Sequence, residues 1–514
     1  MTTQRQTKLI TLGTLCFALF MVMLDSTVVN LAMPTIQRKL GASLTELQWI
    51  VDAYILLLAA LLLTGGTLGD MFGRKRAFLG GLVLFTGGSL MCALSPSTGL
   101  LIAARAFQGV GAAVMMPSTL SILTNTFPDP KERAQAIGAW AGISGLALAI
   151  GPLVGGAMVD NLGWQSIFLI NVPIGIIALA VAWRFVPESS DRAGRGLDLP
   201  GQATAIVGLA TLTYAFIEAN TYGWTSARIL TCFIVAAVAL SLFALIELRS
   251  KSPMLQLGFF RNPTFLGANL VGVIISFGFF GVIFFLSLFM QEVQGYSPLR
   301  AGLLQLPCTL AIAVTAVASG GIVGRVGSRL PMTLGLGLLG AGLLFLTALE
   351  PTTPYTSWWY WMVLIGLGMG LIMSPMTSAI MSTVPAARAG MASATSNTLR
   401  QVGSVFGIAV LGDIVTHRFT GQLSSALSAY HLPPSAVGKI MAVASQGRQA
   451  MPKMPAGVDA AAIGRTIGLS FTSGIHLALW VSGFLLLAGV PIALFMVRGT
   501  TPQAAPGLVE AVTE

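Results

Sequence analysis

The run Leu9–Met33 reads LITLGTLCFALFMVMLDSTVVNLAM, and Asp25 is its one charged side chain. A helix needs roughly 20 mostly apolar residues to cross a bilayer, so this run predicts a membrane-spanning helix. It contains no small-residue cleavage site, and we therefore interpret it as a retained span rather than a removable signal. A carboxylate is costly to bury in such a helix, which makes Asp25 a candidate functional residue.

Comparable apolar runs fill most of the chain. Of its 514 residues, 55% are hydrophobic and 9% are charged, whereas soluble domains carry roughly 25% charged residues. The chain therefore has too little charge to cover its own surface unless most of that surface faces lipid. We predict an all-α integral membrane protein with fourteen transmembrane helices. Their expected bounds are 9–33, 47–69, 77–95, 99–124, 135–159, 164–186, 200–219, 228–248, 264–290, 302–324, 330–348, 357–384, 397–416 and 474–498.

The distribution of basic residues predicts the orientation. Most of the cations behind the net charge of +10 fall in alternate loops, as they do in cytoplasmic loops under the positive-inside rule. With the N-terminus inside, the short outward loops hold only Arg38, Lys39, Arg228 and Arg300. We expect a multi-pass protein of the cell inner membrane with both termini in the cytoplasm. We expect the positively charged loops to face the lipid bilayer, and binding to nucleic acid is a poor interpretation of the net charge.

Two glycine-flanked basic turns indicate an internal repeat. One is Gly69-Asp70-Met71-Phe72-Gly73-Arg74, and the other is Gly324-Arg325-Val326-Gly327-Ser328-Arg329. Pairing them makes 264–514, which includes an outward loop at 417–473, a second copy of the six-helix half 1–186. The segment 187–263 is then a linker with two inserted helices. Two six-helix pseudo-repeats around a central cavity are a transporter architecture.

Three charged residues lie inside predicted spans: Asp25, Asp52 and Arg105. A lone charge there costs at least ~2.5–3.5 kcal/mol on insertion scales, so each needs a partner or water. The simplest arrangement is one carboxylate–guanidinium cluster beside an aqueous cavity. Asp25 would hold a proton when isolated from Arg105 and release it when the two pair. A static salt bridge is the alternative, and Asp52 can equally be explained by its closeness to the outer interface.

Other residues admit a functional and a structural interpretation. Glu218, Glu292 and Asp413 lie near outer helix ends, where solvation explains them; Asp413 is the best cavity candidate because its flanks are apolar. In Gly151-Pro152-Leu153-Val154-Gly155-Gly156, the proline bends a helix and the glycines permit close approach of a neighbour. This segment predicts a hinge or gate, with simple packing as the alternative.

Several chemistries find no support in the sequence. No GxxxxGK[ST] nucleotide loop occurs, and Gly335-x-Gly337-x-x-Gly340 lies inside a predicted helix, where helix packing explains it. Three histidines and four cysteines show no metal-ligand spacing. We therefore expect neither an enzyme nor a bound nucleotide, metal or organic cofactor.

The motifs together resemble the major facilitator superfamily, in particular its fourteen-helix drug:proton antiporter branch (the EmrB/QacA type). The similar segments cover nearly the whole chain. They are Leu24-Asp25-Ser26-Thr27-Val28-Val29-Asn30-Leu31-Ala32-Met33-Pro34, Gly66-Thr67-Leu68-Gly69-Asp70-Met71-Phe72-Gly73-Arg74, Arg105-Ala106-Phe107-Gln108-Gly109-Val110-Gly111, Gly151 to Gly156, Trp164 to Gly175, Gly295 to Gly302 and Asn397 to Gly403.

This resemblance implies roles for individual residues. It implies proton coupling by Arg105, and it marks the Gly151-Pro152 segment as typical of exporters. The remaining candidates are an ionic latch in the inner loop (Gly66, Asp70, Gly73 and Arg74), the hinge (Gly151, Pro152, Gly155 and Gly156) and cavity residues (Asn30, Gln108 and Asp413). Ala147 stands where the fuller exporter motif often has glycine, which weakens the gating inference slightly.

The implied function is a proton-driven exporter of small amphipathic or cationic compounds, with the proton gradient as its energy source. A dedicated exporter of one metabolite, antibiotic or lipid stays open as an alternative. So do an uptake transporter on the same fold and a membrane scaffold or sensor without transport. The sequence names neither the substrate nor an adaptor protein.

Overall fold

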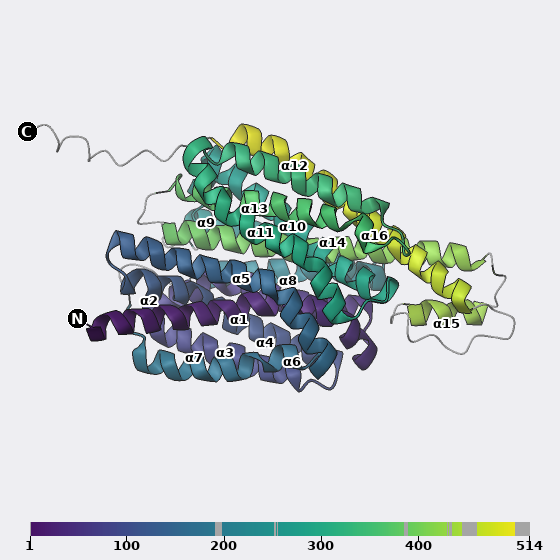
Figure 1. The fold of residues 1–514 in the computed structure, drawn as a ribbon, viewed down its shortest axis with the longest axis horizontal. Helices are drawn as coiled ribbons and strands as arrows, with labels where there is room; N and C mark the ends of the chain where they lie inside the picture. The colour runs from purple at the N-terminus through teal and green to yellow at the C-terminus, as the bar shows by residue number, and fades with distance from the viewer. Residues whose placement is uncertain are drawn as a thin grey trace, which may run out of the picture.

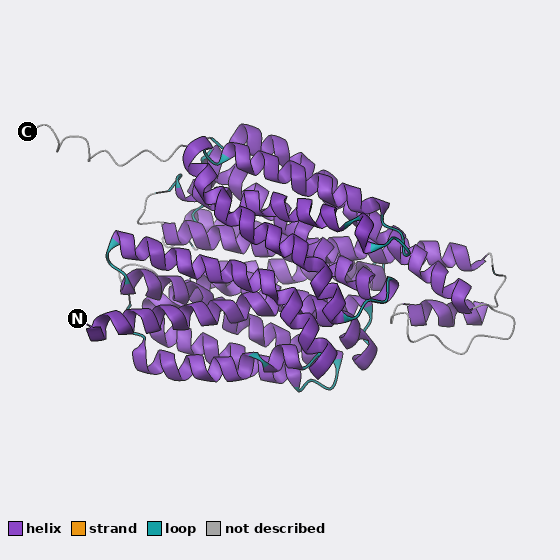
Figure 2. Ribbon diagram, in the orientation of Figure 1, coloured by secondary structure: helices purple, strands orange, loops and turns teal. Residues whose placement is uncertain are grey.

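The computed structural model describes residues 2–190, 198–250, 253, 255–384, 389–428, 430, 434–444 and 460–498, and within these ranges the chain is helical with no strand (Figure 2). The helices are α1 (Thr2–Leu40), α2 (Leu44–Phe72), α3 (Arg74–Ala93), α4 (Thr98–Thr126), α5 (Pro130–Leu162), α6 (Ser166–Leu169), α7 (Asn171–Phe185), α8 (Leu199–Tyr222), α9 (Ala227–Arg249), α10 (Pro263–Leu288), α11 (Pro298–Val326), α12 (Arg329–Phe345), α13 (Trp359–Met381), α14 (Ala389–Ser428), α15 (Pro434–Ala444) and α16 (Ala460–Met496). Short turns are η1 (Leu257–Arg261), η2 (Phe289–Val293), η3 (Leu346–Ala348) and η4 (Tyr355–Ser357).

The long helices match the predicted spans. Thirteen described segments are long and apolar enough to cross a membrane by length and composition, and α5 is a further helix of 33 residues. Many large apolar side chains point outward from the bundle, among them Trp183 at 77% and Val317 at 82% exposure. Such a surface suits lipid rather than water.

Local sequence signals place the helix ends. Ser43 caps α2 with a reciprocal capping box to Glu46, and Ser97 and Ser297 cap α4 and α11 through their hydroxyls. Gly73 and Gly327 end α2 and α11 with φ of 114° and 72°, a region that favours glycine.

The helices form two groups that lie side by side (Figure 1). In the first, α1 packs on α5 and α4 packs on both α2 and α3; in the second, α10 packs on α14 and α13 packs on both α11 and α12. The groups meet where α5 packs on α11 and α2 packs on α14, and the inserted α8 contacts both α2 and α14. We call the end where α1 begins the near end, and the end where α1 stops and α2 starts the far end.

The structure differs from the expected outline in two places. The sixth span is broken into α6 and α7, because Pro173 has no N–H to continue the helix from α6. In the segment expected as an outward loop, 417–473, the described residues form helices instead: α14 and α16 run past the bundle and α15 lies against them, an arrangement we call the helical hairpin. Residues 429, 431–433 and 445–459 of this segment lie outside the described residues. Apolar residues spaced as on one helix face build its own core: Phe419, Leu423, Leu427, Ile440, Ile463 and Ile467. In the linker after α7, residues 191–197 lie outside the described residues.

Candidate functional site

A buried ion pair lies inside the first helix group. Arg105 Nη1 on α4 is 2.5 Å from Asp25 Oδ2 on α1, and both side chains are fully buried. Two charges removed from water in this way attract one another strongly, and leaving either one alone would be costly. The predicted association of Asp25 with Arg105 is therefore present in the geometry.

Three polar side chains complete the coordination of this pair. Gln108 Nε2 donates to Asp25 Oδ1 at 2.9 Å, while Gln108 Oε1 accepts from Arg105 Nη1 at 2.7 Å. Asn171 Nδ2 lies 3.3 Å from Asp25 Oδ1, and Ser89 Oγ accepts from both Gln108 and Asn171. Gln108 therefore touches both charges at once.

The guanidinium of Arg105 is held by groups that do not depend on Asp25. Its Nε donates to the Ile50 carbonyl of α2 at 3.0 Å. The Tyr54 and Phe168 rings lie 4.2 Å and 5.7 Å from its Cζ, where ring faces attract a cation. Nη2 is buried and donates to no group in the described part of the chain. Arg105 is thus anchored in place independently of Asp25.

The structure places Asp52 apart from the Asp25–Arg105 pair, and its part in proton coupling stays a prediction. Asp52 is fully buried on α2, and neither of its carboxylate oxygens has a hydrogen-bond partner within the described residues. Ile50 and Tyr54 turn toward α4, and two residues of an α-helix span about 200°, so Asp52 faces away from Arg105. Gln48, one turn earlier on the face of Asp52, donates to the Ile408 carbonyl of α14. Asp52 therefore lies on the side of α2 that meets the second helix group.

Two further cavity candidates also lie outside the Asp25–Arg105 cluster. The Asn30 carbonyl on α1 accepts from Ser287 Oγ of α10 at 2.9 Å, so Asn30 sits where the two groups meet. Asp413 on α14 interacts with the Trp224 side chain and with His417. Of the three predicted cavity residues, Gln108 alone contacts the ion pair.

Ser89 and Asn171 escaped the sequence analysis. Both are buried polar residues in apolar helices, and Asn171 lies within the Trp164 to Gly175 motif. For Asn171 the sequence offered one signal, an amide side chain that needs hydrogen-bond partners, at a break between two helices. Its link to Asp25 depended on the tertiary packing of α7 against α1 and α3.

The hinge segment on α5 packs against both helix groups. A Cβ on Gly155 would lie 2.9 Å from Val28 Cβ of α1, within the first group, and one on Gly151 would overlap the Thr27 side chain. A Cβ on Gly156 would lie 2.5 Å from the Pro298 carbonyl oxygen of α11, in the second group. Each contact excludes a side chain at the α5 position, so the three glycines of the predicted hinge allow α5 to touch two partners closely.

Comparison with known proteins identifies the family. The model of the Major Facilitator Superfamily matches residues 15–408. The chain belongs to this superfamily. Multidrug resistance protein Stp of Mycobacterium tuberculosis (strain CDC 1551 / Oshkosh) is 39% identical over 427 residues, which make up 82% of this chain and 78% of that protein. The tetracenomycin C resistance and export protein of Streptomyces glaucescens is 34% identical over 500 residues, or 96% of this chain and 93% of that protein.

A solved structure agrees on the fold. The crystal structure of a bacterial homologue of the human lysosomal transporter Spinster, inward-facing and occupied, has a TM-score of 0.64 at 17% identity and covers 95% of this chain and 96% of its own. The predicted all-α major facilitator fold and the predicted family are therefore confirmed. This major facilitator protein is a multi-pass membrane transporter, and its relatives include proteins named for antibiotic resistance and export.

Polar contacts join the two helix groups, which we now call the first and second halves of the transporter, toward the far end. Besides the Ser287 bond to α1, Gln291 Nε2 donates to the Leu31 carbonyl at 3.1 Å. Asp160 Oδ2 at the end of α5 accepts from the Leu299 N–H at the start of α11, 3.0 Å away, where a helix N-terminus favours an anion. Arg38 and Glu292 approach to 3.9 Å. This conformation therefore brings the halves together at the far end.

The predicted inner-loop latch residues lie at the near end of the transporter. Arg74 and Asp70 form an ion pair at 2.9 Å within the first half. The Arg74 N–H donates to the Ser189 carbonyl at 2.8 Å, and the Glu188 carboxylate lies against Gly73, where it accepts from the Lys75 N–H. In this conformation the loop is thus tied to the segment after α7.

We predict that Asp70→Asn slows the transport cycle more than it weakens substrate binding. The Arg74 and Asp70 side chains are 17% and 9% exposed, and even the contribution of a surface ion pair, about 1 kcal/mol, is enough to shift an equilibrium between two conformations several-fold. Turnover and substrate affinity, measured separately in proteoliposomes, check the prediction. Arg76→Ala removes one cation of the same loop and serves as the topology control. Unchanged turnover in Asp70→Asn would leave the loop as a positive-inside anchor only.

Proposed function

We propose that this transporter is a proton-coupled exporter of small amphipathic compounds, and that the compounds include several antibiotics or biocides. The observation that carries the proposal is the Asp25–Arg105 pair, whose ionisable carboxylate is fully buried among the helices. Ionisable groups in such positions are characteristic of proton relays in transporters. The names of the Mycobacterium and Streptomyces relatives support export of toxic small molecules.

Asp25 can either carry a proton or form an ion pair with Arg105. In the described conformation the pair is closed. When a proton neutralises Asp25, Arg105 keeps the Ile50 carbonyl and Gln108 Oε1, so the cation retains hydrogen-bond acceptors. Gln108 can still hydrogen-bond to a protonated carboxyl group, because an amide offers both a donor and an acceptor. The cluster thus supports both protonation states.

Helix α1 links this cluster to the contact between the halves. Asn30 and Leu31, whose carbonyls accept from Ser287 of α10 and Gln291 of η2, follow Asp25 by five and six residues, which is roughly 8 Å along a helix. A shift or rotation of α1 when Asp25 gains a proton would therefore act directly on these bonds. We infer that the proton enters from the far end, that the compound leaves there, and that the near end and both termini face the cytoplasm.

The energy available to such a cycle is sufficient for useful efflux. An inward-negative membrane supplies about 2.3 kcal/mol per 100 mV for each proton, and a pH difference adds about 1.4 kcal/mol per unit. One proton can thus sustain a substrate gradient of at least about tenfold. No nucleotide or other cofactor is needed for this scheme.

Everted membrane vesicles test the direction of transport. With the vesicle interior acidified, we expect a cationic dye to accumulate inside and to leave when a protonophore dissipates the gradient. Gradient-dependent uptake in right-side-out vesicles would instead identify an importer, and no flux in either orientation would support a scaffold or sensor. A panel of dyes, biocides and antibiotics in a pump-deficient host separates a broad exporter from one dedicated to a single compound. The relative named for tetracenomycin C resistance and export favours the second possibility, an exporter dedicated to a single compound.

A further inference from the structure

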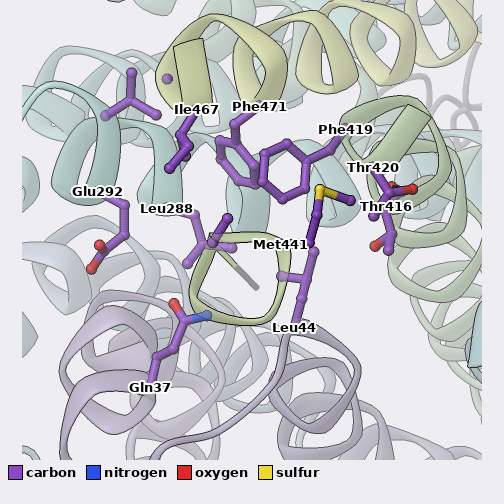
Figure 3. A pocket seen from close by; sticks show the side chains of 13 residues that line it. Gln37, Leu44, Leu288, Glu292, Thr416, Phe419, Thr420, Met441, Ile467 and Phe471 are labelled. Carbon is purple, nitrogen blue, oxygen red and sulfur yellow. Dashed lines mark hydrogen bonds between the residues drawn. The ribbon is translucent and has the colours of Figure 1, made fainter. Parts of the chain in front are cut away.

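A pocket lies at the far end, away from the Asp25–Arg105 cluster and between the helical hairpin and both halves of the transporter (Figure 3). Its cavity volume is ≈ 80 Å³, whereas one water molecule needs roughly 10–15 Å³. There is room for one apolar group the size of a ring or a short alkyl chain. Its apolar walls include Leu44, Leu288, Phe419, Met441, Ile467 and Phe471.

The chemistry of the pocket combines an apolar interior with a carboxylate. The Phe419 and Phe471 rings meet edge to face at 5.7 Å between centroids and form one wall. Met441 of α15 supplies a flexible thioether, a side chain that adapts to varied ligands. Glu292 also lines the pocket, and its side chain is 12% exposed. The Glu292 carboxylate lies 3.9 Å from Arg38 Nε.

The pocket spans elements that are expected to move relative to one another. Gln37 and Leu44 come from α1 and α2 of the first half, while Leu288 and Phe471 come from α10 and α16 of the second. The hairpin helix α15 closes the remaining side through Met441. A ligand bound here would favour the conformation in which the far ends meet, because separating the halves takes the pocket apart.

We propose that this far-end pocket is a second binding site, which takes one apolar ring of an amphipathic organic cation while Glu292 holds the charge. This second-site proposal rests on the proposed function only for the chemical class of the bound compound. On this proposal, the described helices of the hairpin, α15 with the adjoining ends of α14 and α16, provide a vestibule on the release side. A compound that reaches high concentration there rebinds and slows the cycle of the exporter.

Chemical protection of a cysteine placed in the pocket tests the proposal. Thr420 lines the pocket and is partly exposed, so we use Thr420→Cys in the full-length chain in lipid nanodiscs, with Cys232 replaced by alanine. Of the native cysteines, Cys16, Cys92 and Cys308 are buried. We expect ethidium to slow maleimide labelling of this cysteine in a saturable manner. No protection at any ethidium concentration would overturn the proposal.

A pair of leucine variants separates the pocket from the rest of the hairpin. A Cβ at Gly468 would lie 3.5 Å from Val293 Cγ1, at ordinary contact distance inside the pocket, whereas one at Gly438 meets nothing within 4 Å. Gly468→Leu should raise the ethidium concentration that gives half-protection about tenfold or more, because the ring loses its apolar site. Gly438→Leu should leave it unchanged. Equal values in the two variants would overturn the pocket as the site.

Charge recognition is tested with Glu292→Gln. This variant should weaken protection by ethidium but not by uncharged phenanthridine; an equal effect on both compounds would overturn the role of Glu292. All measurements are made without a gradient and are repeated in the Asp25→Asn background. Protection that persists there while export is absent separates the vestibule from the transport cycle. These measurements therefore distinguish a failure of the far-end pocket proposal from a failure of the proposed proton-coupled export.

Discussion

Asp25→Asn should abolish proton-driven accumulation of substrate, reducing it to the level of vesicles that lack the transporter. Asparagine cannot bind and release a proton in the working pH range, yet its amide can still bond with Gln108 and Arg105. The variant should therefore lose the coupling step and keep much of the local hydrogen bonding. The measurement is substrate accumulation together with substrate-induced proton release in proteoliposomes. A variant that still confers resistance and still releases protons would show that Asp25 is not the proton carrier.

The fold of this variant needs its own control. Removing one partner of a buried ion pair can cost about 3–5 kcal/mol, because Arg105 keeps its charge inside the bundle. The double variant Asp25→Asn, Arg105→Gln removes both charges and should be inactive as well, with abundance and elution profile close to the parent. We expect exchange of substrate down its own gradient to persist in Asp25→Asn. Loss of exchange in both variants would instead indicate a structural role for the ion pair.

The sequence was sufficient to predict the architecture because the bilayer constrains each span by itself. Length and apolar character locate a helix without knowledge of its neighbours, and the expected runs coincide with the long helices. The association of Asp25 with Arg105 was also accessible, since buried charges of opposite sign require partners. Here a local physical rule and the motif resemblance led to the same pair.

What escaped prediction depended on helix rotation and packing. Asp52 was expected in one cluster with Asp25 and Arg105 because all three are charged residues inside predicted spans, but a position within a span does not fix which way a side chain faces. Only the packing of Ile50 and Tyr54 against α4 turns Asp52 toward α14. The helical hairpin was not predicted from the sequence for a related reason. Its apolar face is narrow, and its burial appears only when α14, α15 and α16 lie together.

Gly156→Leu should block export by preventing the two halves from closing at the far end. A Cβ at this position would lie 2.5 Å from the Pro298 carbonyl oxygen and 2.8 Å from Leu299 Cα, both backbone atoms that cannot rotate away. Overpacking of this kind typically costs about 1–3 kcal/mol, which shifts a two-conformation equilibrium roughly 5–150-fold. The conformation with the far ends together is the one penalised, because α5 and α11 touch in it.

Two further leucine variants on α5 distinguish a block of the far-end contact from other effects of the added side chain. Gly155→Leu pushes against Val28 within the first half and should also impair export, through α1 rather than through the far-end contact. Gly142→Leu adds the same bulk where a Cβ meets nothing within 4 Å, and it should transport normally. Distances between spin labels on the far ends of α5 and α11 should lengthen in Gly156→Leu alone. A folded Gly156→Leu with normal efflux and unchanged distances would show that this glycine contact is packing and not a gate.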